Sequence, residues 1–475
     1  MAIEGTRRWI NLWVHEPQRR ASLWRQITPP QLFVASFLAL IALGAIGLRT
    51  LPGLYTGPGL DWKDAIFTSV SAVCVTGLIV VDTATYFTAT GQAFLLLLIQ
   101  LGGLGMITFS TLIILALGRR LSLRHEQLVS PRAEVAPHVR TQSLTRTVVR
   151  FTLLLEAAGA AVLYLAWAPD LGWKAAAWPA VFHSVSAFCN AGFSVFSDSL
   201  IGFQRSPVVL IVIMVLIIAG GLGFLTIEEA HLWRRARRSG PRFRLSLHSR
   251  LALGTSAVLL VAGWTLFAIF EWHVTLADLP LPHRLINSLF LSVTPRTAGF
   301  NSIDYASATD STNFLTILFM FVGGSPGSTA GGVKTTTIAL LVLLAWSRFR
   351  GRETVNVWGR TIPEETMQRA VGLALTAFAL LTVCIFLYTY TEHTGITEGH
   401  ARFLTIMFEA ASAINTVGLS MGATPTLSDA GKWITIFLMF VGRVGPLTFA
   451  AALALAAHRG RRDQFRYAHE DVVVG

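Results

Sequence analysis

Four short segments of this 475-residue chain share a glycine in fourth place, a pattern suited to binding a cation through the backbone. The segments are CVTGL at 74–78, CNAGF at 189–193, RTAGF at 296–300 and NTVGL at 415–419. Backbone carbonyl groups around one axis can replace the hydration shell of a cation. Turning successive carbonyl groups inward requires positive φ at some position, which glycine adopts without a steric cost. We therefore predict that the four segments together form an ion filter.

The predicted filter takes three residues from each segment, ending at the glycine. These residues are Val75, Thr76, Gly77, Asn190, Ala191, Gly192, Thr297, Ala298, Gly299, Thr416, Val417 and Gly418. A second glycine signature follows each segment: LGGLG at 101–105, AGGLG at 219–223, VGGSPG at 322–327 and VGRVG at 441–445. Small residues also recur wherever membrane helices pack closely, so for this second signature a packing role and a pore role both stay open.

The composition indicates that membrane helices position these segments. The chain is 53% hydrophobic and 13% charged, whereas a soluble protein carries about 25% charged residues. Apolar stretches at 31–51, 94–117, 208–226 and 251–270 each approach or exceed the roughly 20 residues that span a bilayer as a helix. The first residues lack the apolar core and cleavage site of a signal peptide, so we expect none to be removed.

The net charge of +12 has a topological explanation. Arginines cluster near both chain ends and in three linkers, at about 119–150, 234–250 and 348–360. The positive-inside rule places all five clusters in the cytoplasm. We expect no nucleic-acid partner, while a basic face for anionic lipid or an acidic partner stays open. The three cysteines are too few and too scattered for a disulfide framework or a metal cluster.

We predict an all-α integral membrane protein with four repeats, each a spanning helix, a short pore helix with its filter segment, and a second spanning helix. The repeats are 31–117, 147–233, 249–346 and 367–457, between cytoplasmic ends at 1–30 and 458–475. The short helices are expected at about 63–74, 178–189, 284–294 and 402–413. Because irregular backbone at membrane depth must be buried or line a cavity, four such segments favour one shared pore with pseudo-fourfold symmetry.

Two departures from the repeat pattern predict a gate. In the third repeat, GGSPGSTAGGVKTTT at 323–337 must break the second helix, because proline removes a donor and glycine weakens helix propagation. In the fourth repeat Arg443 replaces a glycine, and a charge at a helix centre costs about 2.5–3.5 kcal/mol on insertion scales. The predicted gate residues are Gly323, Gly324, Ser325, Pro326, Gly327, Ser328, Thr329, Gly331, Gly332, Lys334 and Arg443.

The gate prediction leaves alternatives open. Arg443 can instead form an ion pair or cap the broken helix, and Lys334 can cap the same helix. We expect the broken segment to have little packing that holds it in place. Arg296, inside the third filter segment, is expected to brace the loop through backbone carbonyls or an acid such as Asp304 or Glu409. The partners of Asp64, Glu156, Glu271 and Glu409 cannot be assigned from the sequence, although helix capping suffices for Asp64. His183 is expected to be a packed histidine.

On these segments the chain resembles the membrane subunits of the Trk/Ktr/HKT superfamily of K⁺ transporters, over residues 31–457. A first spanning helix that begins by Gln31 and the closing EDVVVG resemble the Ktr-type subunit. The resemblance implies K⁺ at the filter carbonyls, Na⁺ as an activator, and a homodimer in a bacterial cell membrane. It also implies a cytoplasmic ring of nucleotide-binding RCK subunits as partner. This chain has no GxGxxG after a strand and no P-loop, so we expect it to bind no nucleotide.

Other functions remain as alternatives. A Na⁺-conducting member of the superfamily is the first, although glycine at all four filter positions resembles the K⁺-permeable pattern. An integral-membrane enzyme acting on lipid or prenyl substrates is the second, and it needs a DDxxD or HxxxH cluster that the sequence lacks. A non-conducting receptor or scaffold is the third, and four retained filter segments argue against it.

Overall fold

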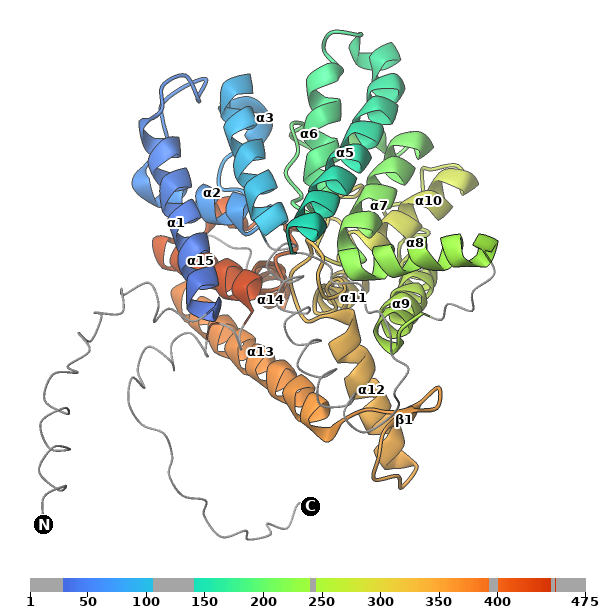
Figure 1. The fold of residues 1–475 in the computed structure, drawn as a ribbon. Coiled ribbons are helices and arrows are strands. Elements are labelled where there is room, and N and C mark those ends of the chain that lie inside the picture. The colour runs from blue at the N-terminus through green and yellow to red at the C-terminus, as the bar shows by residue number, and fades with distance from the viewer. Residues whose placement is uncertain (1–28, 106–140, 240–244, 393–399, 446–448, 450–475) are drawn as a thin grey trace, which may run out of the picture.

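The computed structural model describes the chain except residues 1–28, 106–140, 240–244, 393–399, 446–448 and 450–475 (Figure 1). The predicted tail at 458–475 and nearly all of the predicted N-terminal segment therefore lie outside the described residues. Within the described part almost every element is a helix. A small hairpin of β1 (Asn356–Val357) and β2 (Arg360–Thr361) is the exception, with antiparallel pairing of Val357 to Arg360.

Four long helices are apolar and long enough to cross a membrane. They are α1 (Pro29–Thr50), α5 (Thr141–Leu171), α9 (Leu247–Glu271) and α13 (Glu364–Thr391). Between 17% and 33% of each apolar stretch is buried inside the protein, so most of its surface faces outward. Large side chains such as Leu154 (70% exposed) and Phe386 (71% exposed) make up that outer surface, as contact with lipid requires.

A short helix follows each long one. These are α2 (Trp62–Val73), α6 (Ala177–Phe188), α10 (Leu281–Val293) and α14 (His400–Ile414), close to the predicted ranges. They contain 12 to 15 residues. At 1.5 Å per residue they extend about 18–22 Å, less than the ~30 Å hydrocarbon core. Each short helix leads directly into one of the four glycine segments.

A second helix completes each of four successive units, a unit being one long, one short and one second helix. The second helices are Ala89–Gly105, α7 (Pro207–Gly221) with α8 (Phe224–Ser239), α11 (Asp310–Met320) with α12 (Thr335–Phe349), and α15 (Asp429–Val444). The loops before them hold α3 (Thr83–Tyr86) and the 3-10 turns η3 (Ile201–Phe203) and η4 (Thr424–Thr426). In the third unit, where we predicted a break, the helix stops at Met320 and resumes at Thr335.

The second unit differs from the sequence expectation. We expected one spanning helix at the end of the repeat 147–233, but α7 and α8 meet at a bend of 100°. Gly223 lies at the bend with φ +80°, and the Phe224 amide donates to the Gly327 carbonyl 3.1 Å away. Glycines weaken the helix at this bend, and the hydrogen bond to the third unit gives the Phe224 amide a partner that the second unit's own sequence does not reveal.

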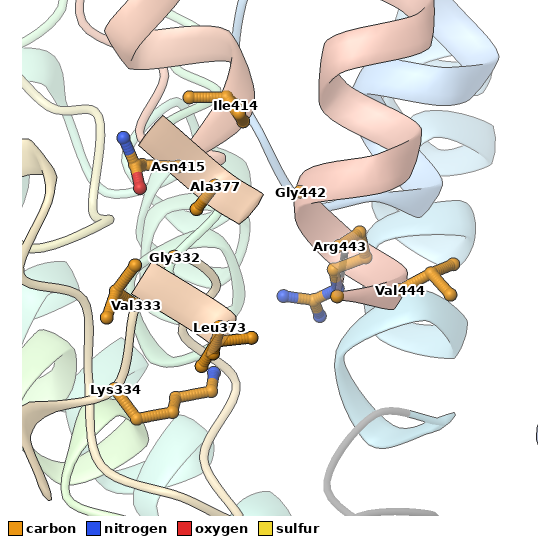
Figure 2. Close-up of a pocket in the computed structure, with 11 residues that line it drawn as sticks. Gly332, Val333, Lys334, Leu373, Ala377, Ile414, Asn415, Gly442, Arg443 and Val444 are labelled. Carbon is orange, nitrogen blue, oxygen red and sulfur yellow. The ribbon is translucent and has the colours of Figure 1, made fainter. Parts of the chain in front are cut away.

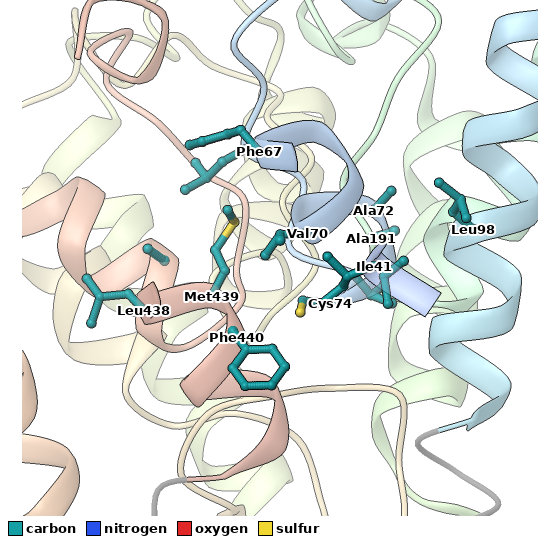
Figure 3. Close-up of a cluster of buried hydrophobic side chains, with 14 of the residues drawn as sticks. Ile41, Phe67, Val70, Ala72, Cys74, Leu98, Ala191, Leu438, Met439 and Phe440 are labelled. Atoms are coloured by element: carbon teal, nitrogen blue, oxygen red, sulfur yellow. The ribbon is translucent and has the colours of Figure 1, made fainter. Parts of the chain in front are cut away.

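The units pack side by side and the fourth meets the first. One hydrophobic cluster combines Phe67, Val70 and Cys74 of the first unit with Met439 and Phe440 of the fourth (Figure 3). At the edge of this contact two ion pairs cross between the same helices. Lys432 bonds Asp64 at 2.8 Å, and Lys63 bonds Asp429. These contacts join the ends of the described chain, so the units close on themselves.

Glycines of the second helices contact the ends of the short helices. A Cβ atom built on Gly102 would lie 2.0 Å from the carbonyl oxygen of Val73, the last residue of α2. The same relation holds for Gly220 with Phe188 at 2.0 Å and for Gly442 with Ile414 at 1.9 Å. For these glycines of the second signature, close packing of helices explains the residue type.

We predict that Gly102→Ala lowers the free energy of unfolding by about 1–3 kcal/mol, the usual effect of overpacking a tight contact. Gly254→Ala in α9 is the matched control, since nothing lies within 4 Å of its added Cβ. Its stability should be unchanged or slightly higher, because alanine is the better helix former. The thermal midpoints of the purified variants, followed by loss of the monodisperse gel-filtration peak, test this. Equal midpoints for the two variants would contradict it.

Candidate functional site

The four glycine segments meet at one place in the centre of the molecule. A Cβ atom built on each glycine would collide with the carbonyl oxygen of the residue that precedes the next glycine. The pairs are Gly77 with Ala191 at 2.4 Å, Gly192 with Ala298 at 3.0 Å, Gly299 with Val417 at 2.5 Å, and Gly418 with Thr76 at 2.1 Å. The fourth contact returns to the first segment. We call the carbonyl groups of Thr76, Ala191, Ala298 and Val417 the carbonyl ring.

The backbone of all four segments follows the same unusual path. The glycines have φ values of +70° to +96°, as expected from the sequence. The residue two places earlier also has positive φ in every segment, which the sequence did not indicate. These residues are Val75 (φ 55°), Asn190 (φ 58°), Thr297 (φ 72°) and Thr416 (φ 49°). Left-handed backbone costs roughly 1–2 kcal/mol at a residue with a side chain, so the surrounding structure must impose it.

Hydroxyl groups at the ends of the short helices hold this path in place. The Ser71 hydroxyl donates to the Leu78 carbonyl at 2.7 Å and accepts the Gly77 amide at 3.2 Å. In the second unit the Ser186 hydroxyl donates to the Phe193 carbonyl at 2.8 Å. Thr294 does the same for Phe300, and Ser412 accepts the Gly418 amide.

On one side of the glycines lies a cavity of about 330 Å³ that all four glycines line. Asp82, Asp198 and Asp304, from the loops that follow three of the segments, also line it. The Asp82 carboxylate accepts hydrogen bonds from the Ala84 amide at 3.0 Å and the Ser197 hydroxyl at 2.6 Å. These bonds hold carboxylate oxygens in the cavity wall, where they favour an approaching cation.

On the other side of the glycines lies the interruption in the second helix of the third unit. It comprises Gly323–Lys334, and we call it the crossing segment. Contrary to our expectation, it is firmly held. Its Ser325 amide donates to the Gly221 carbonyl at 2.9 Å, and its Thr329 amide donates to the Gly220 carbonyl at 3.2 Å. Ser325, Ser328 and Thr329 are buried. Polar residues that suggested a loose loop in the sequence serve here as hydrogen-bonding groups in a packed region.

The crossing segment contacts the end of α6 in the second unit and the glycine segment of the fourth unit. The Thr329 hydroxyl donates to the Phe188 carbonyl at 3.2 Å. A Cβ atom built on Gly331 would lie 2.0 Å from the hydroxyl oxygen of Thr416, and one on Gly332 would lie 3.1 Å from the Asn415 amide oxygen. Glycine at 331 therefore lets the crossing segment lie directly against the inner end of the fourth segment.

Arg443 connects three units beneath the filter segments. Its side chain is 1% exposed, and its guanidinium donates to the Thr329 carbonyl and to the Gly102 carbonyl, the latter at 3.3 Å. No ion pair of Arg443 occurs among the described residues. The alternative of a structural ion pair therefore finds no support, whereas capping of free carbonyls does. Lys334 similarly donates to the Ala330 carbonyl at 2.6 Å.

Arg296 does not have the partners that we expected. Glu409 accepts from Ser420, Thr424 and the Met421 amide, and Asp304 accepts from the Ala306 amide at 2.9 Å. In the described part of the chain, Arg296 Nε is buried without a hydrogen-bond partner. Both acids are already used to hold their own loops, which is why neither reaches the arginine.

The other buried acids bond polar groups rather than cations. Glu156 accepts from the Gln100 amide at 3.1 Å, and Glu271 accepts from the Thr309 amide at 3.0 Å. Asp64 is only partly buried, and it pairs with Lys432, while Asp61 caps the helix. His183 is a packed histidine as expected, with its ring stacked on Phe196 and its nitrogens 2.9 Å from the Pro179 carbonyl and Ser194 hydroxyl. No cluster of potential metal ligands occurs among the described residues.

This arrangement of helices is similar to that of a known protein, and the chain matches a known family. Residues 28–460 match the family described as TrkH, cation transport protein. The fold is similar to the crystal structure of the potassium transporter TrkH from Vibrio parahaemolyticus, with a TM-score of 0.72 at 20% identity. That similarity covers 93% of this chain and 87% of the other.

Two curated relatives are similar over nearly their whole length. The Ktr system potassium uptake protein B of Bacillus subtilis is 38% identical, covering 95% of this chain and 98% of the relative. The potassium/sodium uptake protein NtpJ of Enterococcus hirae is 36% identical with the same coverage. The chain belongs to the TrkH family of cation transport proteins, which confirms the predicted resemblance and the expectation that it is a transporter and not an enzyme.

We predict that Ser71→Ala lowers the free energy of unfolding by about 1–3 kcal/mol, because it leaves a buried carbonyl and a buried amide without a partner. Ser36→Ala is the matched control, since the Ser36 hydroxyl bonds only the Phe33 carbonyl within α1. Its stability should change by less than about 0.5 kcal/mol. Thermal unfolding of the purified variants, followed by tryptophan fluorescence, measures both. A Ser71→Ala midpoint equal to that of Ser36→Ala would show that the hydroxyl does not hold the segment.

Proposed function

We propose that this chain is a potassium uptake protein whose K⁺ pathway runs through the carbonyl ring. The observation that carries the proposal is the contact of four glycine segments, each against a carbonyl of the next. Carbonyl groups so gathered replace the hydration shell of K⁺. The cavity with three aspartates on one side supplies cations to them. The names of the Bacillus and Vibrio relatives, both potassium transporters, support the same ion.

The four units then stand with pseudo-fourfold symmetry around one pore. The chain crosses a bacterial cell membrane several times, with both ends in the cytoplasm. The recurrence of long, short and second helices supports this arrangement, as does the position of the basic linkers. Each short helix re-enters from the outside. Its glycine segment returns through irregular backbone that the other three segments enclose.

The gate in this proposal is the crossing segment with Arg443. Both lie on the side of the filter opposite the acidic cavity, and the crossing segment touches Thr416. At an effective dielectric constant near 20, a fixed charge ~4 Å from a passing cation raises its energy by about 4 kcal/mol. Because the crossing segment hydrogen-bonds to Gly220, Gly221 and Phe224 at the α7–α8 bend, opening requires that bend to move.

Assembly completes the proposal. The Ktr-type likeness supports a homodimer that sits on a cytoplasmic ring of RCK subunits, with Na⁺ as an activator. The closing EDVVVG at 470–475, which resembles the Ktr-type subunit, lies outside the described part of the chain. The name of the Enterococcus relative, a potassium/sodium uptake protein, favours Na⁺ permeation as the second candidate function.

We predict that Gly77→Ser reduces Rb⁺ uptake at least tenfold, because a side chain there meets the Ala191 carbonyl at 2.4 Å. K⁺ and Rb⁺ should lose more flux than Na⁺, since an added hydroxyl narrows the ring. Gly53→Ser is the matched control: Gly53 also has positive φ (+75°), but nothing lies within 4 Å of its added Cβ. Flux into proteoliposomes measures both variants. Full Rb⁺ uptake by folded Gly77→Ser would remove this glycine from the pathway.

We also predict that Arg443→Gln raises Rb⁺ flux, by about tenfold if it removes 1.4 kcal/mol of the electrostatic barrier. Arg284→Gln is the matched control. Arg284 likewise donates to backbone carbonyls, but these are the carbonyls of Trp272 and Leu279, which follow α9. Its flux should remain at the wild-type value. If Arg443→Gln stays folded and conducts no faster than Arg284→Gln, the barrier lies elsewhere.

A further inference from the structure

A second cavity, of about 190 Å³, lies beside the crossing segment and is distinct from the acidic cavity. Four elements form its wall: the end of the crossing segment, α13, the end of α14 and the end of α15. The lining residues include Val333, Lys334, Leu373, Ala377, Ile414 and Arg443. Its volume far exceeds the about 15 Å³ that one water molecule needs, so it can hold a larger group.

Two cationic side chains share this cavity without an acid. Figure 2 shows the Arg443 guanidinium and the Lys334 amino group pointing into the space between the crossing segment and α15. Each donates to backbone carbonyls, but Arg443 Nε is buried and has no hydrogen-bond partner in the described part of the chain. No Asp or Glu occurs among the described residues that line the cavity. Uncompensated positive charge of this kind favours an anion, because buried charges are normally paired.

The remaining wall is apolar, and part of it belongs to a lipid-facing helix. Leu373 and Ala377 lie on α13, which is at the edge of the molecule in Figure 1 and has only 22% of its apolar stretch buried. Val333, Ile414 and Val444 add further apolar surface. A small inorganic anion gains nothing from contact with apolar walls, whereas the glycerol and acyl carbons of a phospholipid are stabilised by such contact.

We propose that this cavity binds the phosphate group of an anionic phospholipid between Lys334 and Arg443, with the lipid's carbon chains against α13. Phosphate accepts several charge-assisted hydrogen bonds, and the Lys334 ammonium and the Arg443 guanidinium carry more N–H donors than the carbonyls they bond can accept. The rest of this inference depends on the proposed function. A phosphate there offsets the positive charge beneath the filter, so anionic lipid lowers the barrier to K⁺ and raises flux.

Lipid binding is measured directly, without any transport. The full chain, purified in detergent, is titrated with phosphatidylglycerol or phosphatidylcholine, and retained lipid is counted by native mass spectrometry. We expect at least tenfold tighter retention of phosphatidylglycerol. Leu373→Trp fills the cavity and should abolish the preference. Leu375→Trp on the same helix, 63% exposed, is the matched control and should keep it. Lys334→Gln removes charge at little change in volume and should weaken retention even if Leu373→Trp fails to fold.

Added inorganic phosphate distinguishes the source of the anion. If phosphatidylglycerol is still retained in the presence of inorganic phosphate, the lipid assignment is supported. If inorganic phosphate displaces phosphatidylglycerol, the site binds a free anion and the lipid assignment is overturned. Equal retention of the two lipids, or unchanged retention by Lys334→Gln, overturns the site itself. Rb⁺ flux in phosphatidylcholine liposomes with and without phosphatidylglycerol is measured separately. If no Rb⁺ flux is seen although phosphatidylglycerol binds, the proposed function fails and the lipid site stands.

Discussion

Irregular backbone inside a membrane protein must be enclosed by other protein, and here the four glycine segments enclose one another. Each glycine lies so close to a carbonyl of the next segment that a Cβ atom has no room. Closure therefore needs all four segments at once. The short helices stop at the depth where this contact forms, and hydroxyls such as Ser71 and Ser186 fix the turn that follows. Positive φ at Val75 or Thr416 persists only because these contacts impose it.

The same requirement for close backbone approach explains why the third unit is different. Gly102, Gly220 and Gly442 bring their helices against the carbonyl at the end of a short helix. In the third unit, Gly323 instead meets the carbonyl of Gly331, at 2.1 Å from a built Cβ. The chain between these two glycines occupies the space beneath the filter segments. The third unit thus lacks this helix contact and forms the crossing segment instead.

Residue patterns predicted what depends on local sequence and missed what depends on distant contacts. The long and short helices, the glycine turns and the break at Pro326 follow from apolar length, glycine and proline. The bend at Gly223 was not predicted, because the carbonyl that the Phe224 amide bonds there, that of Gly327, belongs to another unit. The crossing segment looked loose for the same reason. Its Gly, Ser and Thr residues lack a hydrophobic pattern, yet they bond carbonyls that only the folded protein brings near.

In the proposed function, Arg443 serves both structure and transport. A carboxylate partner would stabilise the buried charge and also cancel its field. Backbone carbonyls of Gly102 and Thr329 satisfy two guanidinium donors instead, and their dipoles leave a net positive charge. The protein thereby keeps a cation beneath the filter at the cost of an incompletely compensated site. The proposed barrier to K⁺ and the proposed affinity for an anion are two consequences of that same uncompensated charge. An anion that enters the adjoining cavity would then change the barrier without moving the crossing segment.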